Sequence, residues 1–204
     1  MRNIYIIVTA LVASFTMNAQ QKGNIEFGFN VGYNSTSVSD GDAVRDPDYN
    51  RSFNFGASAD YYFSDRWSIK AKLIYDKKGW DNTSMLVDDF YVITDIDTDY
   101  ITIPVMANWH FGRKRNWYLN FGPYIGFLTN AKDTKLNLDL KDDFNTTDAG
   151  LAIGIGVKIP VGDKVKIFIE YDYQGGFSDV FKQNDYDAVT TIRGAFNLGL
   201  NFML

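Results

Sequence analysis

Apolar and polar residues alternate with a period of two over eight separate segments of this chain. Large apolar side chains occupy one parity and small, polar or charged ones the other in residues 25–34, 53–63, 67–76, 101–111, 117–127, 150–159, 165–173 and 193–204. This period is typical of β-strands whose two faces meet different surroundings. Each segment has about ten residues, which is enough for a tilted strand to cross a membrane. The pattern therefore predicts eight strands and an all-β fold.

The segments between these strands alternate in length as well. Residues 64–66, 112–116 and 162–164 predict tight turns, whereas residues 35–50, 81–99, 129–148 and 174–190 predict long loops. Short turns at one end and long loops at the other are the layout of outer-membrane β-barrels. An antiparallel arrangement is expected, because such short turns join only antiparallel neighbours.

The direction of the apolar face separates a membrane barrel from a soluble sandwich or a lipocalin-like barrel, which also alternates with period two. Eight strands enclose room for only one layer of side chains, so the bulky parity fits better outside, against lipid. Aromatic residues gather at the strand ends, as interfacial girdles require: Tyr61, Phe63, Trp67, Trp109, Phe111 and Trp117 beside the short turns, and Tyr33, Tyr75, Tyr171 and Tyr173 toward the long loops. We predict an eight-stranded antiparallel transmembrane β-barrel located in the cell outer membrane.

The N-terminus has the layout of a secretory signal peptide. Arg2 precedes an apolar run over residues 4–15, and Ala19 offers the small residue expected before a cleavage site. A membrane-anchoring helix is the alternative, but it needs about 20 apolar residues. We predict a signal peptide over residues 1–19 and a barrel domain over residues 20–204. The chain has no Cys, which excludes disulfides, thiol catalysis and thiolate metal sites.

The inward parity of the predicted strands carries acids and bases in equal number. They are Glu26, Asp60, Lys70, Lys72, Asp76, Lys158, Lys166, Glu170, Asp172 and Arg193. Charges inside a narrow lumen must be paired and hydrogen-bonded to offset their desolvation. We interpret the ten residues as a balanced lumen charge network that plugs the barrel. A proton or ion path and a paired-carboxylate active site are the alternatives.

No catalytic, cofactor-binding or metal-binding residue is predicted, and we expect a protein that is not an enzyme and has no cofactor. The single His, His110, lies at the short-turn end of its strand without a visible triad partner. The Asp95, Asp97 and Asp99 run resembles the start of a calcium loop, but Tyr100 stands where the turn needs Gly, which excludes an EF-hand.

Charge is segregated between the two predicted ends of the barrel. The segment over residues 81–99 contains no Lys or Arg but carries Asp81, Asp88, Asp89, Asp95, Asp97 and Asp99. An acidic, solvated loop is the simplest interpretation, with weak divalent-cation binding to lipopolysaccharide as the alternative. At the other end, the basic turn Arg113, Lys114 and Arg115 suits anionic head groups or a periplasmic protein rather than nucleic acid, given the signal peptide.

Three runs of sequence carry a family resemblance. They are YITIPV at residues 100–105, NFGPY at residues 120–124 and LGLNF at residues 198–202. Because proline inside a closed sheet costs a ladder hydrogen bond, Pro104 and Pro123 are unusual for an arbitrary barrel. With these runs the chain resembles the PorT-type outer-membrane β-barrel family of Bacteroidetes.

The resemblance implies a small structural or interaction component of the cell envelope, such as a subunit of a secretion or assembly complex. The expected partners are outer-membrane lipid and lipopolysaccharide, together with other outer-membrane or periplasmic proteins. A narrow channel for ions or small solutes and an outer-membrane hydrolase with a lumen-rim carboxylate site are the alternative functions.

Overall fold

The computed structural model describes residues 22–39, 42–87 and 90–204. The predicted signal peptide over residues 1–19 lies outside the described residues and stays a prediction. Within the described part, no helix is long and apolar enough to cross a membrane.

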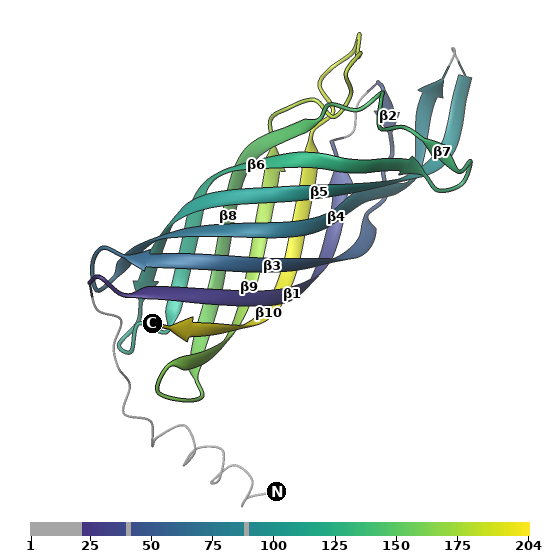
Figure 1. Cartoon of the computed structure of the whole chain (residues 1–204). Coiled ribbons are helices and arrows are strands. Elements are labelled where there is room, and N and C mark those ends of the chain that lie inside the picture. Colours follow the sequence, from purple (N-terminus) through teal and green to yellow (C-terminus); the bar gives the residue numbers. More distant parts are fainter. Residues whose placement is uncertain (1–21, 40–41, 88–89) are drawn as a thin grey trace, which may run out of the picture.

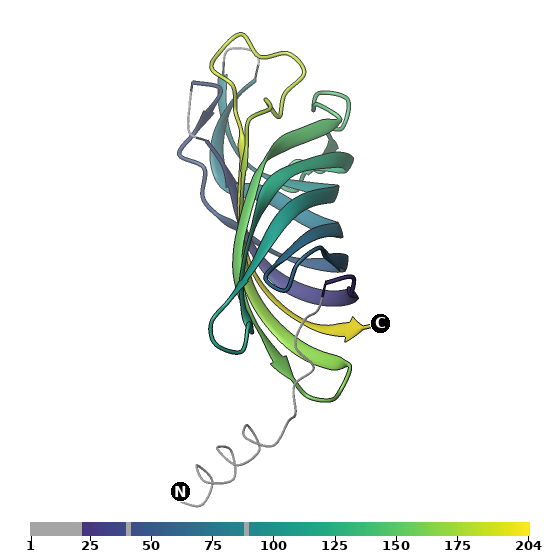
Figure 2. The same ribbon diagram turned by 90° about the vertical axis from the view of Figure 1, so that its left-hand side faces the viewer.

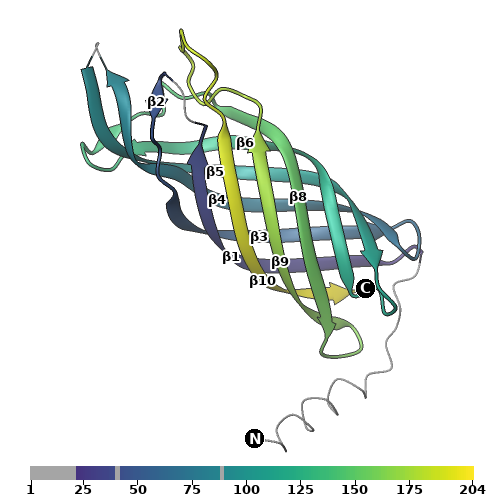
Figure 3. The ribbon, with the colours of Figure 1, turned by 180° about the vertical axis from the view of Figure 1, so that it is seen from behind.

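Eight long strands form one closed antiparallel barrel (Figure 1). With two short strands of two residues each, the described residues form ten strands: β1 (Ile25–Val38), β2 (Val44–Arg45), β3 (Asn50–Tyr62), β4 (Trp67–Val87), β5 (Phe90–Phe111), β6 (Trp117–Asp133), β7 (Leu138–Asp139), β8 (Thr147–Pro160), β9 (Val165–Gly176) and β10 (Thr191–Met203). Around the barrel the order is β1, β3, β4, β5, β6, β8, β9, β10, and β10 pairs with β1 to close it, as seen from behind in Figure 3. The short β2 and β7 pair with β4 and β6 outside this ring. The predicted fold class is confirmed.

The stagger of the strands follows from the pairing register. A path of paired residues that leaves β1 at Ile25 crosses Tyr61, Ile69, Ala107, Phe121, Ile153, Tyr173 and Gly194, and it returns to β1 at Ser35. The return point lies ten residues farther along the strand. This shear tilts the strands against the barrel axis, so residues of distant strands meet inside the lumen.

The two parities of the strands face opposite environments, as the alternation predicts. Outward residues of β1 and β3 are exposed, with Phe29 and Phe53 each 61% accessible, whereas inward Asn34 and Asn54 are fully buried. The long connections gather at one end of the barrel, and the short turns lie with the C-terminus at the other (Figure 2). The aromatic residues of the predicted girdles, except the half-buried Phe111, are exposed near these two ends.

The prediction of a long loop over residues 81–99 is wrong. Strands β4 and β5 continue as a paired hairpin up to Val87 and Phe90, which projects beyond the other strands (Figure 1). The reason is that Asp95, Asp97 and Asp99 occupy the outward parity of β5, while the β-branched residues between them are buried. The two strands therefore stay paired in a segment whose outward aspartates led the sequence analysis to predict a loop.

The β3 and β4 strands separate near the long-loop end of the barrel. Their ladder ends at Asn54 and Asp76. Beyond it, the Ser52 hydroxyl donates to the Lys77 carbonyl at 2.6 Å, and backbone pairing resumes at a bridge between Asp48 and Asp81. Between these points β4 changes course at Gly79, whose φ of 143° and close approach to the Ile96 carbonyl both require glycine. A register shift follows between Trp80 and Thr83.

Candidate functional site

The lumen at the short-turn end holds the first group of buried charges. The Lys158 ammonium donates to Glu26, to Asp60 at 3.2 Å and to the Tyr62 hydroxyl at 2.9 Å. Lys166 donates to the other Glu26 oxygen at 2.8 Å. Two carboxylates and two ammonium groups therefore form a neutral layer, which we call the lower layer.

A second group of charges fills the middle of the lumen. Glu170 accepts hydrogen bonds from Lys70 at 3.2 Å and from Lys72, and Lys72 also reaches Asp172 at 3.3 Å. Asn120 adds a hydrogen bond to Glu170 at 2.9 Å. Lys70 and Lys72 lie on β4, which is opposite to the β9 strand that carries both carboxylates.

Arg193 completes this middle layer. Its guanidinium donates to Asp76 at 2.7 Å and to Asp172. Asn34 donates to the same Asp76 oxygen at 2.9 Å and Asn197 to Asp172 at 2.8 Å. Three cations and three carboxylates again balance. All ten residues of the lumen charge network thus lie in two separately neutral layers, an arrangement that offsets the desolvation of each charge.

A separate buried ion pair lies above the middle layer, and the sequence analysis did not predict it. Lys78 donates to Asp148 at 2.9 Å, and both side chains are about 2% exposed. Its ammonium lies over the rings of Tyr100 and Tyr124, at 5.0 and 5.1 Å from their centroids. Lys78 continues the inward parity of Lys70, Lys72 and Asp76, so a longer third strand would have revealed it.

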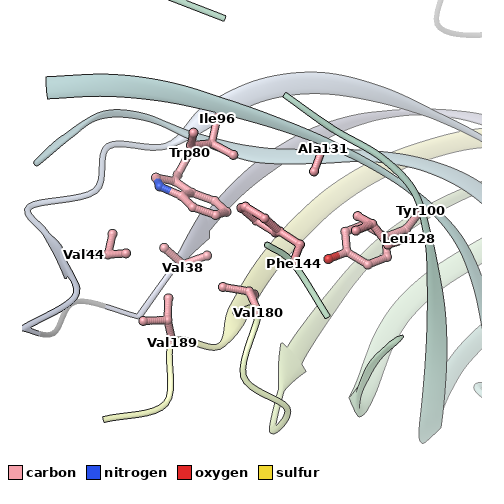
Figure 4. Close-up of a cluster of buried hydrophobic side chains, with 10 residues drawn as sticks. All are labelled: Val38, Val44, Trp80, Ile96, Tyr100, Leu128, Ala131, Phe144, Val180 and Val189. Carbon is pink, nitrogen blue, oxygen red and sulfur yellow. The ribbon is translucent and has the colours of Figure 1, made fainter. Parts of the chain in front are cut away.

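An apolar cluster closes the long-loop end of the barrel, and no sequence pattern predicted it. This mouth cluster contains Val38, Val44, Trp80, Ile96, Tyr100, Leu128, Ala131, Phe144, Val180 and Val189, all buried (Figure 4). Trp80 stacks on Phe144 with ring centroids 6.0 Å apart, and Phe181 packs edge-on against both rings. The cluster joins side chains from the strand ends to side chains from the loops.

Inward glycines make room for the polar side chains of the opposite strands. A Cβ atom on Gly32 or Gly56 would collide with the amides of Asn54, Asn197 or Asn30. Asn30 itself donates to Asn54 and Asn197 at 3.1 Å. The space above the glycines is therefore occupied by an asparagine network between the charged layers.

His110 lies fully buried at the short-turn end of the lumen. Its Nε2 is 3.1 Å from the Ser68 hydroxyl, which is the spacing of a nucleophile and a base. However, Ser68 is also fully buried, and within the described residues Nδ1 has no partner that would orient the ring. The Tyr62 ring covers His110 at 5.0 Å between centroids. Both side chains are therefore closed to solvent in this structure.

The acidic residues Asp95, Asp97 and Asp99 lie on the outward side of β5, nearer the long-loop end than the lipid-facing rows. Asp95 accepts from the Asn82 amide at 2.6 Å and pairs with Lys135 at 2.9 Å, and these donors outweigh partial burial and lower its pKa. Burial raises the pKa of Asp97; Lys77 opposes this rise, and Asp81 and Asp99 add to it. Among the residues described by the structure, no three His, Asp or Glu side chains are grouped to hold a metal ion.

The basic turn between β5 and β6 lies at the end opposite to the acidic hairpin. Arg113 and Lys114 are exposed there, and Arg115 pairs with Asp65 of the neighbouring turn at 3.2 Å. The segregation of charge between the two ends that the sequence indicates is thus present in the structure.

Known proteins share this architecture. OprG from Pseudomonas aeruginosa superposes with a TM-score of 0.62 at 10% identity, covering 92% of this chain and 99% of that chain. The outer membrane protein AlkL in lipid bilayers gives a TM-score of 0.54 at 9% identity, with 93% and 94% of the two chains covered. Neisserial surface protein A gives 0.51 at 18% identity, with 86% and 96% covered. At these identities the similarity shows the fold alone.

The family comparison is more specific than the structural one. The sequence profile of the outer membrane protein beta-barrel domain matches residues 18–182, whereas the comparison with curated proteins found no match. The family and the fold together place the protein in the outer membrane. The chain therefore belongs to the outer membrane protein beta-barrel domain family.

Proposed function

We propose that this protein is a closed, non-enzymatic outer-membrane barrel that acts as a structural and interaction component of the cell envelope. The observation that carries the proposal is the filling of the lumen. Two neutral charged layers, the Lys78 and Asp148 pair and the mouth cluster follow one another along the barrel. The working surfaces are then the outer wall and the two ends.

A narrow channel is disfavoured by the same contacts. An ion that crossed the middle layer would have to displace Arg193 from Asp76 and Asp172, which are buried and charge-assisted partners. Buried polar atoms without a protein partner in the described residues, such as Asn108 Oδ1 and Asn120 Oδ1, allow water to be held locally. They lie next to the charged layers and do not bypass them.

A hydrolase with a lumen-rim carboxylate site is disfavoured because the lumen carboxylates are already bound by cations and amides. Glu170 and Asp172 are each held by cations and an asparagine amide, so neither is free to act as base or nucleophile. Loss of a measured lipid hydrolysis in Glu170→Gln would contradict the proposal.

Two surfaces suit partners. The hairpin of β4 and β5 extends beyond the other strands on the long-loop side, which faces the exterior in barrels of this type. The basic turn at Arg113 and Lys114 faces the periplasm and suits anionic head groups or an acidic periplasmic protein. Following the resemblance to the PorT-type family of Bacteroidetes, we infer membership of a secretion or assembly complex, in contact with lipid and lipopolysaccharide.

Co-purification from native outer membranes tests this function. The tagged protein is extracted in mild detergent beside a variant in which residues 84–93 are replaced by Asn-Gly, a two-residue turn that closes the hairpin at the paired Thr83 and Thr94. We expect a stoichiometric partner with the wild type and a reduced amount with the shortened variant. A wild-type protein without partner that conducts ions in planar bilayers would contradict the proposal.

A further inference from the structure

The separation of β3 and β4 leaves a cavity in the barrel wall. It has a volume of about 230 Å³ and is lined by Asn50, Arg51, Phe53, Lys77, Asp97 and Asp99, among others. The cavity lies between the end of the β3 and β4 ladder and the bridge of Asp48 to Asp81. Asn34 and Thr36 of β1 donate to the Lys77 and Gly79 carbonyls, each at 2.9 Å, and so close it from the lumen side.

The position of this wall cavity matches the head-group level of the outer leaflet. Phe53 and Tyr75 are outward-facing aromatic residues at the upper end of the lipid-facing rows, 61% and 38% exposed. Arg51 and Lys77 are the next outward-facing residues on the same two strands. A lipid whose acyl chains lie against Phe53 would therefore bring its head group to Arg51 and Lys77.

The two cations at the cavity have unused binding capacity. The Arg51 side chain is exposed, and its guanidinium makes no hydrogen bond or ion pair with another described residue. Lys77 is half exposed, and its ammonium is 3.9 Å from the nearest Asp99 oxygen, which is too far for a strong hydrogen bond. An exposed guanidinium beside an exposed ammonium is suited to a phosphate.

The carboxylates on the other side of the cavity restrict what else the ligand carries. Asp97 and Asp99 would repel a bare phosphate, but they accept hydrogen bonds from hydroxyl groups. Asn50 donates to Asp97 at 3.2 Å and to Asp81 at 2.8 Å, which holds Asp97 in place.

We propose that the wall cavity binds the phosphorylated sugar head group of an outer-leaflet glycolipid. Arg51 and Lys77 bind the phosphate, Asp97 and Asp99 accept hydrogen bonds from the sugar hydroxyls, and the exposed ring of Phe53 contacts the first carbons of the acyl chains. This inference rests on the proposed function, because it names one of the envelope components that the barrel contacts.

Binding of diphosphorylated lipid A to the barrel in phosphatidylcholine nanodiscs tests the site. The double variant Arg51→Gln with Lys77→Gln removes both phosphate ligands. The control Lys141→Gln with Lys182→Gln makes the same charge change on exposed loop lysines, and the exchange Arg51→Lys with Lys77→Arg keeps the charge. A heat-dependent shift in gel mobility verifies that each variant forms the barrel.

We expect the double Gln variant to bind lipid A about tenfold or more weakly than the wild type, since it loses both charge-assisted hydrogen bonds to the phosphate. The control and the exchange variant should stay within about twofold of the wild type, because they keep two cations at the cavity. Equal binding by the double Gln variant would overturn the proposal, as would equal binding of lipid A without phosphates.

Two further binding experiments distinguish a glycolipid from other phosphate-bearing ligands. Phosphatidylglycerol, which has a phosphate but no sugar, should bind less tightly than lipid A. Soluble glucosamine 1-phosphate should compete only weakly, and competition as strong as that of lipid A itself would overturn the assignment to a glycolipid. Co-purification and conductance do not depend on these outcomes, so the failure of this site and the failure of the proposed function are distinguishable.

Discussion

The charged layers and the mouth cluster close the same barrel by opposite physical means. The layers are built from regular strands and use matched ion pairs, such as Arg193 with Asp76 and Asp172. The mouth cluster is built from strand extensions and loops and uses apolar packing around Trp80 and Phe144. The first depends on the exact partners of each side chain, and the second on the volume that is filled.

This difference predicts that substitutions in the two regions destabilise the protein in different ways. Removing one member of an ion-paired layer leaves a buried charge without compensation, and the entire barrel is weakened. Removing one ring from the mouth cluster leaves a cavity, and only the elements that the cluster holds together are loosened. The following predictions are arranged from the largest expected effect to the smallest.

Arg193→Met should have the largest effect. It leaves Asp76 and Asp172 buried without their main cation, and breaking such a pair costs about 3–5 kcal/mol. We expect the free energy of unfolding in detergent, measured by tryptophan fluorescence in urea, to fall by this amount. The exposed Arg51→Met is the matched control, and equal stability of the two variants would contradict the role of the charged layers.

Trp80→Ala should act locally. Truncation of a buried tryptophan costs about 3 kcal/mol, and here the loss falls on the packing of the loops that carry Phe144 and Phe181. We expect faster proteolysis of these loops with little change in the unfolding midpoint of the barrel. Exposed Trp117→Ala is the control, and a large drop in the midpoint with Trp80→Ala alone would refute the separation of the two regions.

The pair of Lys78 and Asp148 lies at the boundary between the two regions and sharpens the comparison. Lys78→Met or Asp148→Asn alone leaves one buried partner uncompensated, whereas the double variant removes both charges. Replacing a complete buried pair is often nearly neutral, so we expect the double variant to lose about 1 kcal/mol or less. A double-mutant cycle measures the free energy of unfolding of the three variants in urea. A double variant less stable than either single variant would show that the pair does not act as a unit.

Asp97→Asn should have the smallest effect, of a few tenths of a kcal/mol. Because burial raises the pKa of Asp97 in the folded hairpin, the folded state holds the proton more tightly than the unfolded state. The wild-type hairpin should therefore gain stability as the pH falls through the raised pKa. Hydrogen exchange of residues 92–99 should show this gain in the wild type and a smaller one in Asp97→Asn.

The alternation of the sequence was sufficient to predict the eight strands, their short-turn ends and the outward parity. The long-loop ends were not predictable in the same way. The register shift between Trp80 and Thr83 breaks the period of two in β4. The aspartates on the outward face of β5 replace the apolar residues by which the alternation is detected, so the extension of β5 was not predicted. A sequence pattern shows parity, but it does not show a shift in strand pairing.

The lumen residues were accessible from parity, but their partners were not. Lys72 meets Glu170 and Asp172 because β4 and β9 lie opposite each other in the closed ring and the shear brings these side chains to the same level. No local pattern gives the shear. The mouth cluster was beyond prediction, since Phe144, Val180 and Val189 come from irregular segments without a period. The wall cavity likewise depends on a break between two strands, and the break begins where the predicted strands over residues 53–63 and 67–76 end.

The most direct test of the closed lumen uses the absence of cysteine from the chain. Asn30→Cys places a single thiol between the charged layers, where Asn30 bonds Asn54 and Asn197, and Lys141→Cys places one on an exposed loop. With a small hydrophilic maleimide in reconstituted vesicles, we expect the loop thiol to react and the lumen thiol to stay unlabelled from either side. Labelling of the lumen thiol at the rate of the loop thiol, in a variant that retains the heat-dependent mobility shift, would contradict the account.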